Sequence, residues 1–329
     1  MLKKFLSLLT ALCLMLTLAA CGGTQDEDTA PDAPIFSAMP QPAGDMAEVY
    51  RISDTVALFA FITSGLDTAV TALACYDMAT DTLLGTVNLG EGWIQLFPIE
   101  GGFAVLDYLD KTYATYDTAC ARQSIVNLAF DSTIGSSNKN GDLLLLTDLF
   151  TGNYHLYDWR THTSKSVDTA VNGLSFVCRG SYQDGFVLSS YQDGLVAIAI
   201  NGTKNTLAAT DESVHKANDL YAAGVVGDDV VFRSLTTGEC WRAAVRGEGE
   251  CFIAAQGDIF LSLTQEAKGK LCYYDLSRRT VAEYAVDGRV VSAALFGTTI
   301  VAVVRTADDR PMTFVCVDAA SLTATAIGA

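Results

Sequence analysis

Apolar and polar residues follow one another along most of the chain in short runs that are typical of β-strands. One unit returns: an apolar strand ends in an aromatic residue and an aspartate, and a polar turn comes next. It appears at Tyr76-Asp77, Tyr116-Asp117, Tyr157-Asp158 and Tyr274-Asp275, and in a weaker form at Val317-Asp318. The intervals between these aspartates are 40, 41, 117 and 43 residues, and 117 is close to three such periods. A period of about 40 residues that holds four short strands predicts the blades of a β-propeller.

Several of the predicted strands are apolar at every position instead of alternating. Examples are residues 56–62, 143–146 and 195–200. Such runs indicate strands that are covered on both faces. Propeller blades pack face to face around a ring, so both faces of their middle strands are buried. We therefore expect an all-β fold, with a single β-propeller of seven four-stranded blades over residues 46–329.

One blade is predicted to be irregular. Only 30 residues separate Val245 from Asp275, whereas matching points in the other blades lie 40 or more residues apart. We expect the fifth blade to lack its outer strand, so that residues 241–245 form an exposed edge with free backbone groups. Two interpretations stay open. Either a partner peptide or the chain's own residues 35–39 add a strand there, or basic side chains guard a short, charged edge.

The turns between the strands contain the residues that tight turns need. Each aspartate of the repeated pair is expected to accept hydrogen bonds from backbone amides two or three residues further on. The sequence Tyr76-Asp77-Met78-Ala79-Thr80, with Leu84-Gly85-Thr86-Val87-Asn88-Leu89 after it, resembles the repeats of the YVTN and quinoprotein-like propellers. The paired residues of WD40 repeats, the docking motifs of quinone-dependent dehydrogenases and the Asp-boxes of sialidases are absent. The resemblance therefore implies a fold without a particular chemistry.

The first residues have the pattern of an export signal. Lys3 and Lys4 precede an apolar run over residues 5–18, which is short for a transmembrane helix. The run ends in Leu18-Ala19-Ala20-Cys21, which resembles the lipobox of bacterial lipoproteins. The resemblance implies cleavage before Cys21 and a diacylglycerol group on its thiol, and two acyl chains on Cys21 would anchor the protein stably. We expect residues 1–20 to be a lipoprotein signal peptide, and the protein to be held on the extracytoplasmic face of the cell membrane.

The stretch between the signal and the first strand differs in composition from the rest. Four of the six prolines lie in it, at positions 31, 34, 40 and 42, among several acidic residues. A segment with few apolar side chains does not repay the entropy of ordering. Residues 21–45 are therefore expected to form a disordered tether that begins with the lipidated cysteine. The formal net charge of the chain is −17, which disfavours nucleic acid as a partner.

No local motif indicates catalysis, a metal or a cofactor, and we predict none of the three. The histidines are His155, His162 and His215, and no two of them have the spacing of a metal site. The sequence has no G-x-S-x-G elbow, no P-loop and no G-x-G-x-x-G motif. A catalytic site that several loops assemble would leave no such motif, so an enzyme stays open as an alternative.

Seven cysteines follow Cys21, and most of them lie inside apolar predicted strands. A free thiol in such a place behaves as a small hydrophobic group. No two of the seven form a C-x-x-C pair, and we expect all seven to be free. Cys240 and Cys251 are the only pair close enough in sequence to suspect.

The candidate binding residues are aromatic and charged residues of predicted turns and of the predicted edge. The sequence Ser181-Tyr182-Gln183-Asp184-Gly185 recurs as Ser190-Tyr191-Gln192-Asp193-Gly194, and polar aromatic turns of this kind suit a sugar or a peptide. The full set is Tyr182, Asp184, Tyr191, Asp193, Trp241 and Arg242.

Two classes of function stay open. The first is a membrane-anchored propeller that binds an unidentified protein, peptide or glycan without chemistry. The alternative is a propeller enzyme, a glycan or peptide hydrolase or lyase, whose site is built from loops between blades. Acids and histidines clustered at one mouth of the ring would favour the enzyme, and an uncharged mouth would favour binding.

Overall fold

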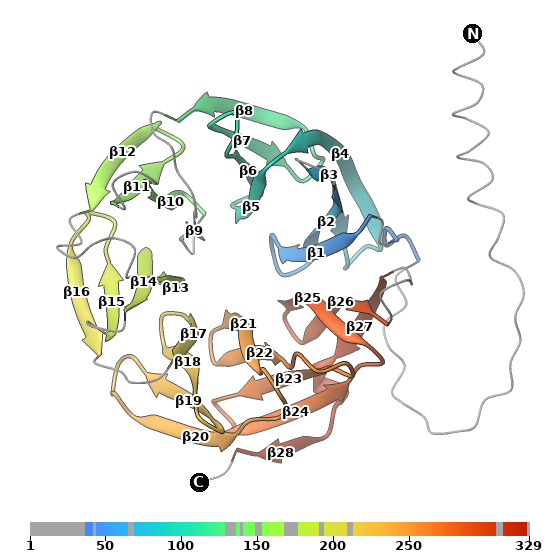
Figure 1. Cartoon of the computed structure of the whole chain (residues 1–329), viewed down its shortest axis with the longest axis vertical. Helices are drawn as coiled ribbons and strands as arrows, with labels where there is room; N and C mark the ends of the chain where they lie inside the picture. The colour runs from blue at the N-terminus through green and yellow to red at the C-terminus, as the bar shows by residue number, and fades with distance from the viewer. Residues whose placement is uncertain are drawn as a thin grey trace, which may run out of the picture. The chain divides into compact units, whose positions relative to one another are not determined.

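The computed structural model describes residues 37–41, 44–64, 69–128, 136–138, 141–148, 153–167, 177–190, 194–208, 213–306 and 312–327. All of them belong to the unit Ala33–Ala329. Seven antiparallel sheets follow one another around a ring in this unit, and their first strands surround its centre (Figure 1). The unit is a seven-bladed β-propeller, so the predicted all-β fold class is confirmed.

Blades one to five are four-stranded meanders that run from the centre of the ring to its outer edge (Figure 1). Blade one consists of β1 (Met46–Arg51), β2 (Val56–Ser64), β3 (Ala69–Asp77) and β4 (Thr82–Gly92). Blade two consists of β5 (Ile94–Ile99), β6 (Gly102–Asp107), β7 (Thr112–Asp117) and β8 (Arg122–Asn127). Blade three consists of β9 (Ser136–Ser137), β10 (Leu143–Thr147), β11 (Tyr154–Asp158) and β12 (Thr163–Val167). Blade four consists of β13 (Val177–Tyr182), β14 (Gly185–Ser190), β15 (Gly194–Ile198) and β16 (Lys204–Ala208). Blade five consists of β17 (Ser213–Ala217), β18 (Tyr221–Val226), β19 (Asp229–Ser234) and β20 (Cys240–Ala244).

Blade six has five strands, and blade seven has three among the described residues. Blade six consists of β21 (Cys251–Gln256), β22 (Ile259–Leu263), β23 (Lys270–Asp275), β24 (Thr280–Ala285) and β28 (Ala324–Ala326). Blade seven has three strands among the described residues, β25 (Arg289–Phe296), β26 (Thr299–Arg305) and β27 (Thr313–Asp318). A regular seventh blade would take its fourth strand from residues 322–327, but these residues do not join blade seven. A short 3₁₀ turn, Ala319–Ser321, redirects the chain, and β28 pairs antiparallel with β24 of the neighbouring blade.

The fifth blade is complete, so the predicted loss of its outer strand is wrong. Residues Cys240–Ala244 are that outer strand, and the strand that the pattern missed is the inner one, β17. The short link from β20 to β21 of blade six contains Glu250, which is 5% exposed and fixes the conformation of the link. Its carboxylate accepts hydrogen bonds from the Arg246 amide (2.6 Å), the Ser262 hydroxyl (2.6 Å) and the Tyr274 hydroxyl (2.8 Å).

The described part of the predicted tether does not pair with β20. The amides of Ser37 and Ala38 each donate to the Asp81 carboxylate of blade one, at 3.0 Å. Met39 is buried in a cluster that also contains Phe314 of β27. These residues therefore lie at blades one and seven, which contradicts their addition to the edge of blade five. Positions 35 and 36 lie outside the described residues.

The repeated Tyr–Asp pair joins the core to the turns as expected. Its tyrosines, Tyr76, Tyr116, Tyr157 and Tyr274, are buried between blades. Its aspartates accept the expected backbone hydrogen bonds. The Asp77 carboxylate accepts one from Ala79 (3.0 Å), and that of Asp158 accepts two, from Arg160 (2.9 Å) and Thr161 (3.2 Å). Each pair therefore ends a third strand with a buried anchor and a capped turn.

Candidate functional site

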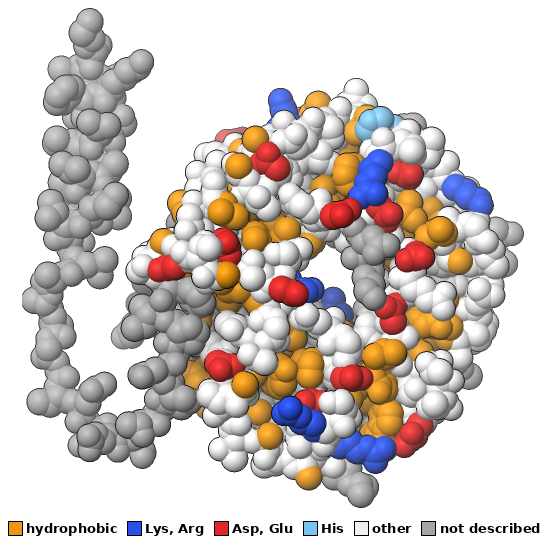
Figure 2. All heavy atoms as spheres, turned by 180° about the vertical axis from the view of Figure 1, so that it is seen from behind, with side chains coloured by type: hydrophobic (Ala, Val, Ile, Leu, Met, Phe, Trp, Pro, Cys, Tyr) orange, Lys and Arg blue, Asp and Glu red, His pale blue; other side chains and the backbone are white. Residues whose placement is uncertain are grey.

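The first strands of the seven blades leave a cavity of about 350 Å³ in the ring, here called the channel. Figure 2 shows the opening at the centre of the propeller, with basic side chains in it and acidic ones at its rim. Every first strand or the turn after it contributes to the wall, mostly with small or apolar residues such as Ala254 and Ala293. Because most of these residues are small and uncharged, a charged side chain among them dominates the character of the wall.

Three of the residues in this wall are basic and none is acidic. The basic residues are Arg51 at the end of β1, Arg179 in β13 and Lys216 in β17. In the chain as a whole, 38 acidic residues outnumber 21 basic ones. The channel therefore has a positive potential inside a negatively charged protein, and its low-dielectric walls strengthen that potential.

The three cations differ in the partners that the described part of the protein gives them. The Nε of Arg179 donates to Ser189 Oγ at 2.7 Å. Arg51 forms an ion pair with Asp54 at the rim, but its Nε is buried without an acceptor among the described residues. Gln256 Oε1, in the same wall, is likewise buried without a described donor.

Lys216 lies on the inner strand of blade five, β17. The described structure gives its ammonium group no hydrogen bond and no ion pair. Burial lowers the pKa of Lys216 below its usual value, and the neighbouring charge of Arg179 lowers it further. Its charged form is therefore disfavoured in the empty channel and would be favoured by an anion.

A second cavity of about 690 Å³, here called the vestibule, adjoins the channel. The two cavities share Arg51, Pro98 and Ser137 in their walls. The remaining vestibule wall comes from the β1–β2, β5–β6 and β9–β10 turns and from Arg160 of the β11–β12 turn. In an antiparallel meander all four of these turns lie on one face of the propeller, so the vestibule opens on that face.

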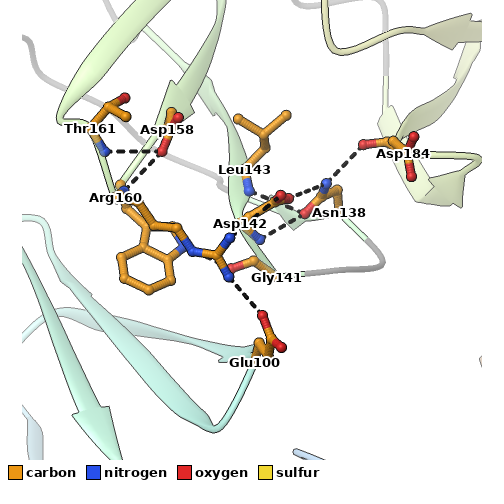
Figure 3. Close-up of polar contacts among 10 residues, drawn as sticks. Glu100, Asn138, Gly141, Asp142, Leu143, Asp158, Arg160, Thr161 and Asp184 are labelled. Carbon is orange, nitrogen blue, oxygen red and sulfur yellow. Dashed lines mark hydrogen bonds and ion pairs between the residues drawn. The ribbon is translucent and has the colours of Figure 1, made fainter.

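Arg160 balances the acidic side chains of the vestibule. Its guanidinium lies 2.7 Å from the carboxylate of Glu100 in blade two and 4.0 Å from that of Asp142 in blade three (Figure 3). It also lies over the Trp159 ring, 5.4 Å from the centroid, and the indole N–H donates to the Gly141 carbonyl at 2.7 Å. Arg160 is thus paired with carboxylates of the vestibule wall. A positive charge without an acidic partner among the described residues, that of Lys216, lies in the channel.

Asn138 connects blade three to blade four beside the vestibule. Its Oδ1 accepts hydrogen bonds from the amides of Asp142 and Leu143, both at 3.1 Å. Its Nδ2 donates to Asp142 Oδ1 (2.7 Å) and to the Asp184 carbonyl (2.8 Å), as Figure 3 shows. The turns of the following blades continue this pattern, since the Gln183 amide donates to the Asp219 carboxylate. Linked turns make a rigid rim, which lowers the entropy lost when a ligand binds.

The predicted binding residues fall in two separate places. Tyr182 and Asp184 lie together in the wall of a pocket of about 250 Å³ in blade four. Trp241 lies on the outer strand β20, where the Arg279 guanidinium is 5.3 Å from its ring centroid. Arg242, beside it, is 3.6 Å from the Asp229 carboxylate of the same blade. The structure does not bring the two pairs together, and their roles stay predictions.

The other predicted sites, Cys21, Tyr191 and Asp193, lie outside the described residues.

Acidic side chains lie at the rim, but the described walls of the channel and the vestibule contain no histidine. His215, in β17, accepts a hydrogen bond from the Phe252 amide (3.4 Å), and burial lowers its pKa. His155 and His162 belong to blade three, in a strand and in an exposed turn. Over the described ranges, no three His, Cys, Asp or Glu side chains are arranged to hold a metal. The arrangement that would favour an enzyme is therefore not found there, although the mouth is charged.

The basic residues of the channel were missed in the sequence. A propeller pattern shows where blades repeat but does not show which weak strand is innermost. The available signal was a basic residue inside a short run of neutral residues, as in Val177-Cys178-Arg179-Gly180. Two such runs in consecutive blades would have indicated the channel.

Comparison with known proteins supports the fold alone. No protein-family model matches the sequence, and no curated protein matches it. Among solved structures, the β-propeller domain of Cps50 (Swd1) from Myceliophteria thermophila is similar with a TM-score of 0.57 and 9% identity, over 84% of this chain and 98% of that one. Apo AztD from Citrobacter koseri gives 0.54 and 11%, over 78% and 90%. The WD40 repeats of RRP9 give 0.52 and 10%, over 84% and 98%.

In the part of the chain that the structure describes, we find no helix with the length and hydrophobicity needed to cross a bilayer.

Proposed function

We propose that this protein is a lipid-anchored, extracytoplasmic propeller that binds a small anion, or an anionic group of a larger ligand, in its channel. The lipobox-like sequence before Cys21 supports the anchor. The basic channel wall supports the ligand class. No residue arrangement in the described part of the protein favours the alternative of an enzyme.

The observation that carries the proposal is the channel wall with Arg51, Arg179 and Lys216 and no acid. An isolated buried cation is costly, because burial removes its hydration without replacing it. Guanidinium and ammonium groups donate several hydrogen bonds, and their strongest partners are carboxylate, phosphate and sulfate oxygens. An anion in the channel would therefore meet basic donors from three inner strands.

The size of the cavities limits the ligand. A channel of about 350 Å³ holds a small molecule or one charged group, and the vestibule of about 690 Å³ leaves room for the rest of a larger ligand. The vestibule presents the paired charges of Arg160 and Glu100. A ligand with an anionic end and a polar body, such as an acidic sugar or a carboxylated peptide, fits both cavities.

Calorimetric titration of the purified full-length protein with phosphate, sulfate and citrate tests the proposal, with maltose as a neutral control. We expect at least one of the anions to bind and maltose not to bind. Lys216→Met and Arg179→Gln should each weaken binding by roughly 10-fold or more, since a hydrogen bond to a charged group contributes about 1.5–3 kcal/mol.

Matched controls separate the channel from the overall charge. Lys268→Met and Arg122→Gln remove the same charges from exposed positions outside the channel, and we expect both to bind as the unchanged protein does. The proposal is wrong if none of the three anions binds. It is also wrong if Lys216→Met binds as tightly as Lys268→Met.

A further inference from the structure

Two thiols meet at the seam between blades one and two. Cys75 lies in β3 of blade one, and Cys120 lies in the β7–β8 turn of blade two. They are 0% and 6% exposed and belong to one apolar cluster with Leu58 and Phe103. The Cys75 thiol donates a hydrogen bond to the Cys120 sulfur. Both are free thiols in this structure.

A close approach of two backbones creates this contact. Cys75 is paired with Gly85 across β3 and β4. A Cβ atom on Gly85 would lie only 2.2 Å from the carbonyl oxygen of Ala119, the residue before Cys120. Only glycine therefore lets the turn of blade two lie directly on the outer strands of blade one. The contact is a fixed feature of the seam.

The backbone of Cys120 adds a second constraint. Its φ angle is +61°, in the left-handed region. Asp81, His162 and Arg279 have the same conformation in the corresponding turns, with φ of 51°, 56° and 54°. Their side chains are partly or fully exposed, whereas that of Cys120 is buried. The turn thus directs the Cys120 side chain into the neighbouring blade, and a left-handed non-glycine residue persists where its surroundings hold it.

The two thiols differ in reactivity. The hydrogen bond from Cys75 lowers the pKa of Cys120, because it stabilises the thiolate. The same hydrogen bond, together with burial, raises the pKa of Cys75. The thiolate is the nucleophile in thiol oxidation, so Cys120 is the thiol that reacts first and Cys75 is the neutral partner beside it.

We propose that a hydroperoxide oxidises Cys120 and that Cys75 then closes a disulfide that joins blades one and two. In the first step the Cys120 thiolate attacks one peroxide oxygen, the O–O bond breaks, and Cys120 sulfenic acid and hydroxide form. In the second step the Cys75 sulfur attacks the sulfenic sulfur, the S–S bond forms, and water leaves with the Cys75 proton. The peroxide is the two-electron oxidant, and the two thiols are the reductant.

Hydrogen peroxide treatment of the purified full-length Cys240→Ser protein tests the proposal. This background removes the thiol that is exposed among the seven. We expect the loss of two thiols per chain, a single peptide pair joined through Cys75 and Cys120 in non-reducing mass spectrometry, and full reversal by dithiothreitol. The disulfide closes a long loop, so the oxidised protein should melt about 3–7 °C higher than the reduced one.

Two variants assign the roles of the thiols. In Cys75→Ser, a dimedone adduct should accumulate on Cys120, because the partner that consumes the sulfenic acid is gone. In Cys120→Ser, neither the disulfide nor the rise in melting temperature should appear. The proposal is overturned if peptide mapping finds Cys75 and Cys120 both unmodified after peroxide treatment. It is also overturned if the disulfide forms between other cysteines.

Discussion

At the scale of single residues, the buried charge of Lys216 predicts a proton that accompanies the ligand. Burial lowers its pKa below the ordinary value of 10.5, and a bound anion would raise it again. Between the lowered and the ordinary pKa, the folded empty protein binds fewer protons than the unfolded chain, so its stability rises with pH in that window. An anion that restores the charge should therefore be taken up together with a proton, and its affinity should fall as the pH rises through the window.

Calorimetry at alkaline pH in two buffers of different ionisation enthalpy measures this uptake. We expect the apparent binding enthalpy to differ between the buffers for the unchanged protein. In Lys216→Met the difference should disappear together with most of the affinity. Equal enthalpies in both buffers for the unchanged protein would contradict a titrating Lys216 at the site.

Residues that repeat were predictable, and residues that occur once were not. The aspartates of the Tyr–Asp pair could be placed in turns because their short side chains reach backbone amides two or three residues away, whatever blade they are in. Arg179 and Lys216 follow no such local rule. Their importance comes from lying on the inner strands of neighbouring blades, and a single sequence contains no record of which strands are innermost.

At the scale of elements, β28 shows that the sequence of a strand does not by itself determine the sheet with which the strand pairs. Its three residues are exposed, and their pattern favours neither neighbouring sheet. The residue that follows β28, Ile327, holds the chain on blade six. Ile327 is 8% exposed and packs among the apolar side chains around Phe260 and Tyr274. The Ile327 amide also donates to the Arg279 carbonyl at 2.8 Å.

Replacing Ile327 should therefore destabilise blade six. Ile327→Ala removes a buried branched side chain at the edge of the core, which costs about 2 kcal/mol or more and lowers the melting temperature by roughly 4 °C. Thr323→Ala changes an exposed residue just before β28 and is expected to have little effect. Equal melting temperatures for the two variants would mean that Ile327 does not anchor the strand.

The inner strands that the sequence pattern did not reveal were missed for one physical reason. The inner strands β9 and β17 are short, and one of their faces borders the channel instead of apolar side chains. Serine and lysine on that face remove the hydrophobic pattern that identifies a strand. The middle strands, such as β10 and β15, are covered on both faces and were found without difficulty. The fold was thus predictable from its buried middle strands, and the site was hidden because its inner strands are less buried than those.

At the scale of the whole molecule, two features of the propeller bear on the proposed lipid anchor. The amides of Ser37 and Ala38 are bound to Asp81 of blade one, so a tether from the N-terminal side would join the ring there. The vestibule contains turns of blades one, two and three. A ligand that enters the vestibule would therefore do so on the part of the ring nearest to the point of attachment.

The predicted lipid anchor would determine on which side of the cell membrane the propeller meets such a ligand. The sequence Leu18-Ala19-Ala20-Cys21 follows a charged and apolar leader, and the acidic, proline-rich residues after it favour an extended tether. In a bacterial host, the unchanged protein should fractionate with membranes, dissolve only with detergent and incorporate a labelled fatty acid. Cys21→Ser should lose the label and leave the membrane fraction or keep its uncleaved leader. Cys240→Ser, a cysteine replacement on the outer strand of blade five, should behave as the unchanged protein. Membrane retention and fatty-acid labelling that survive in Cys21→Ser would show that Cys21 is not the anchor.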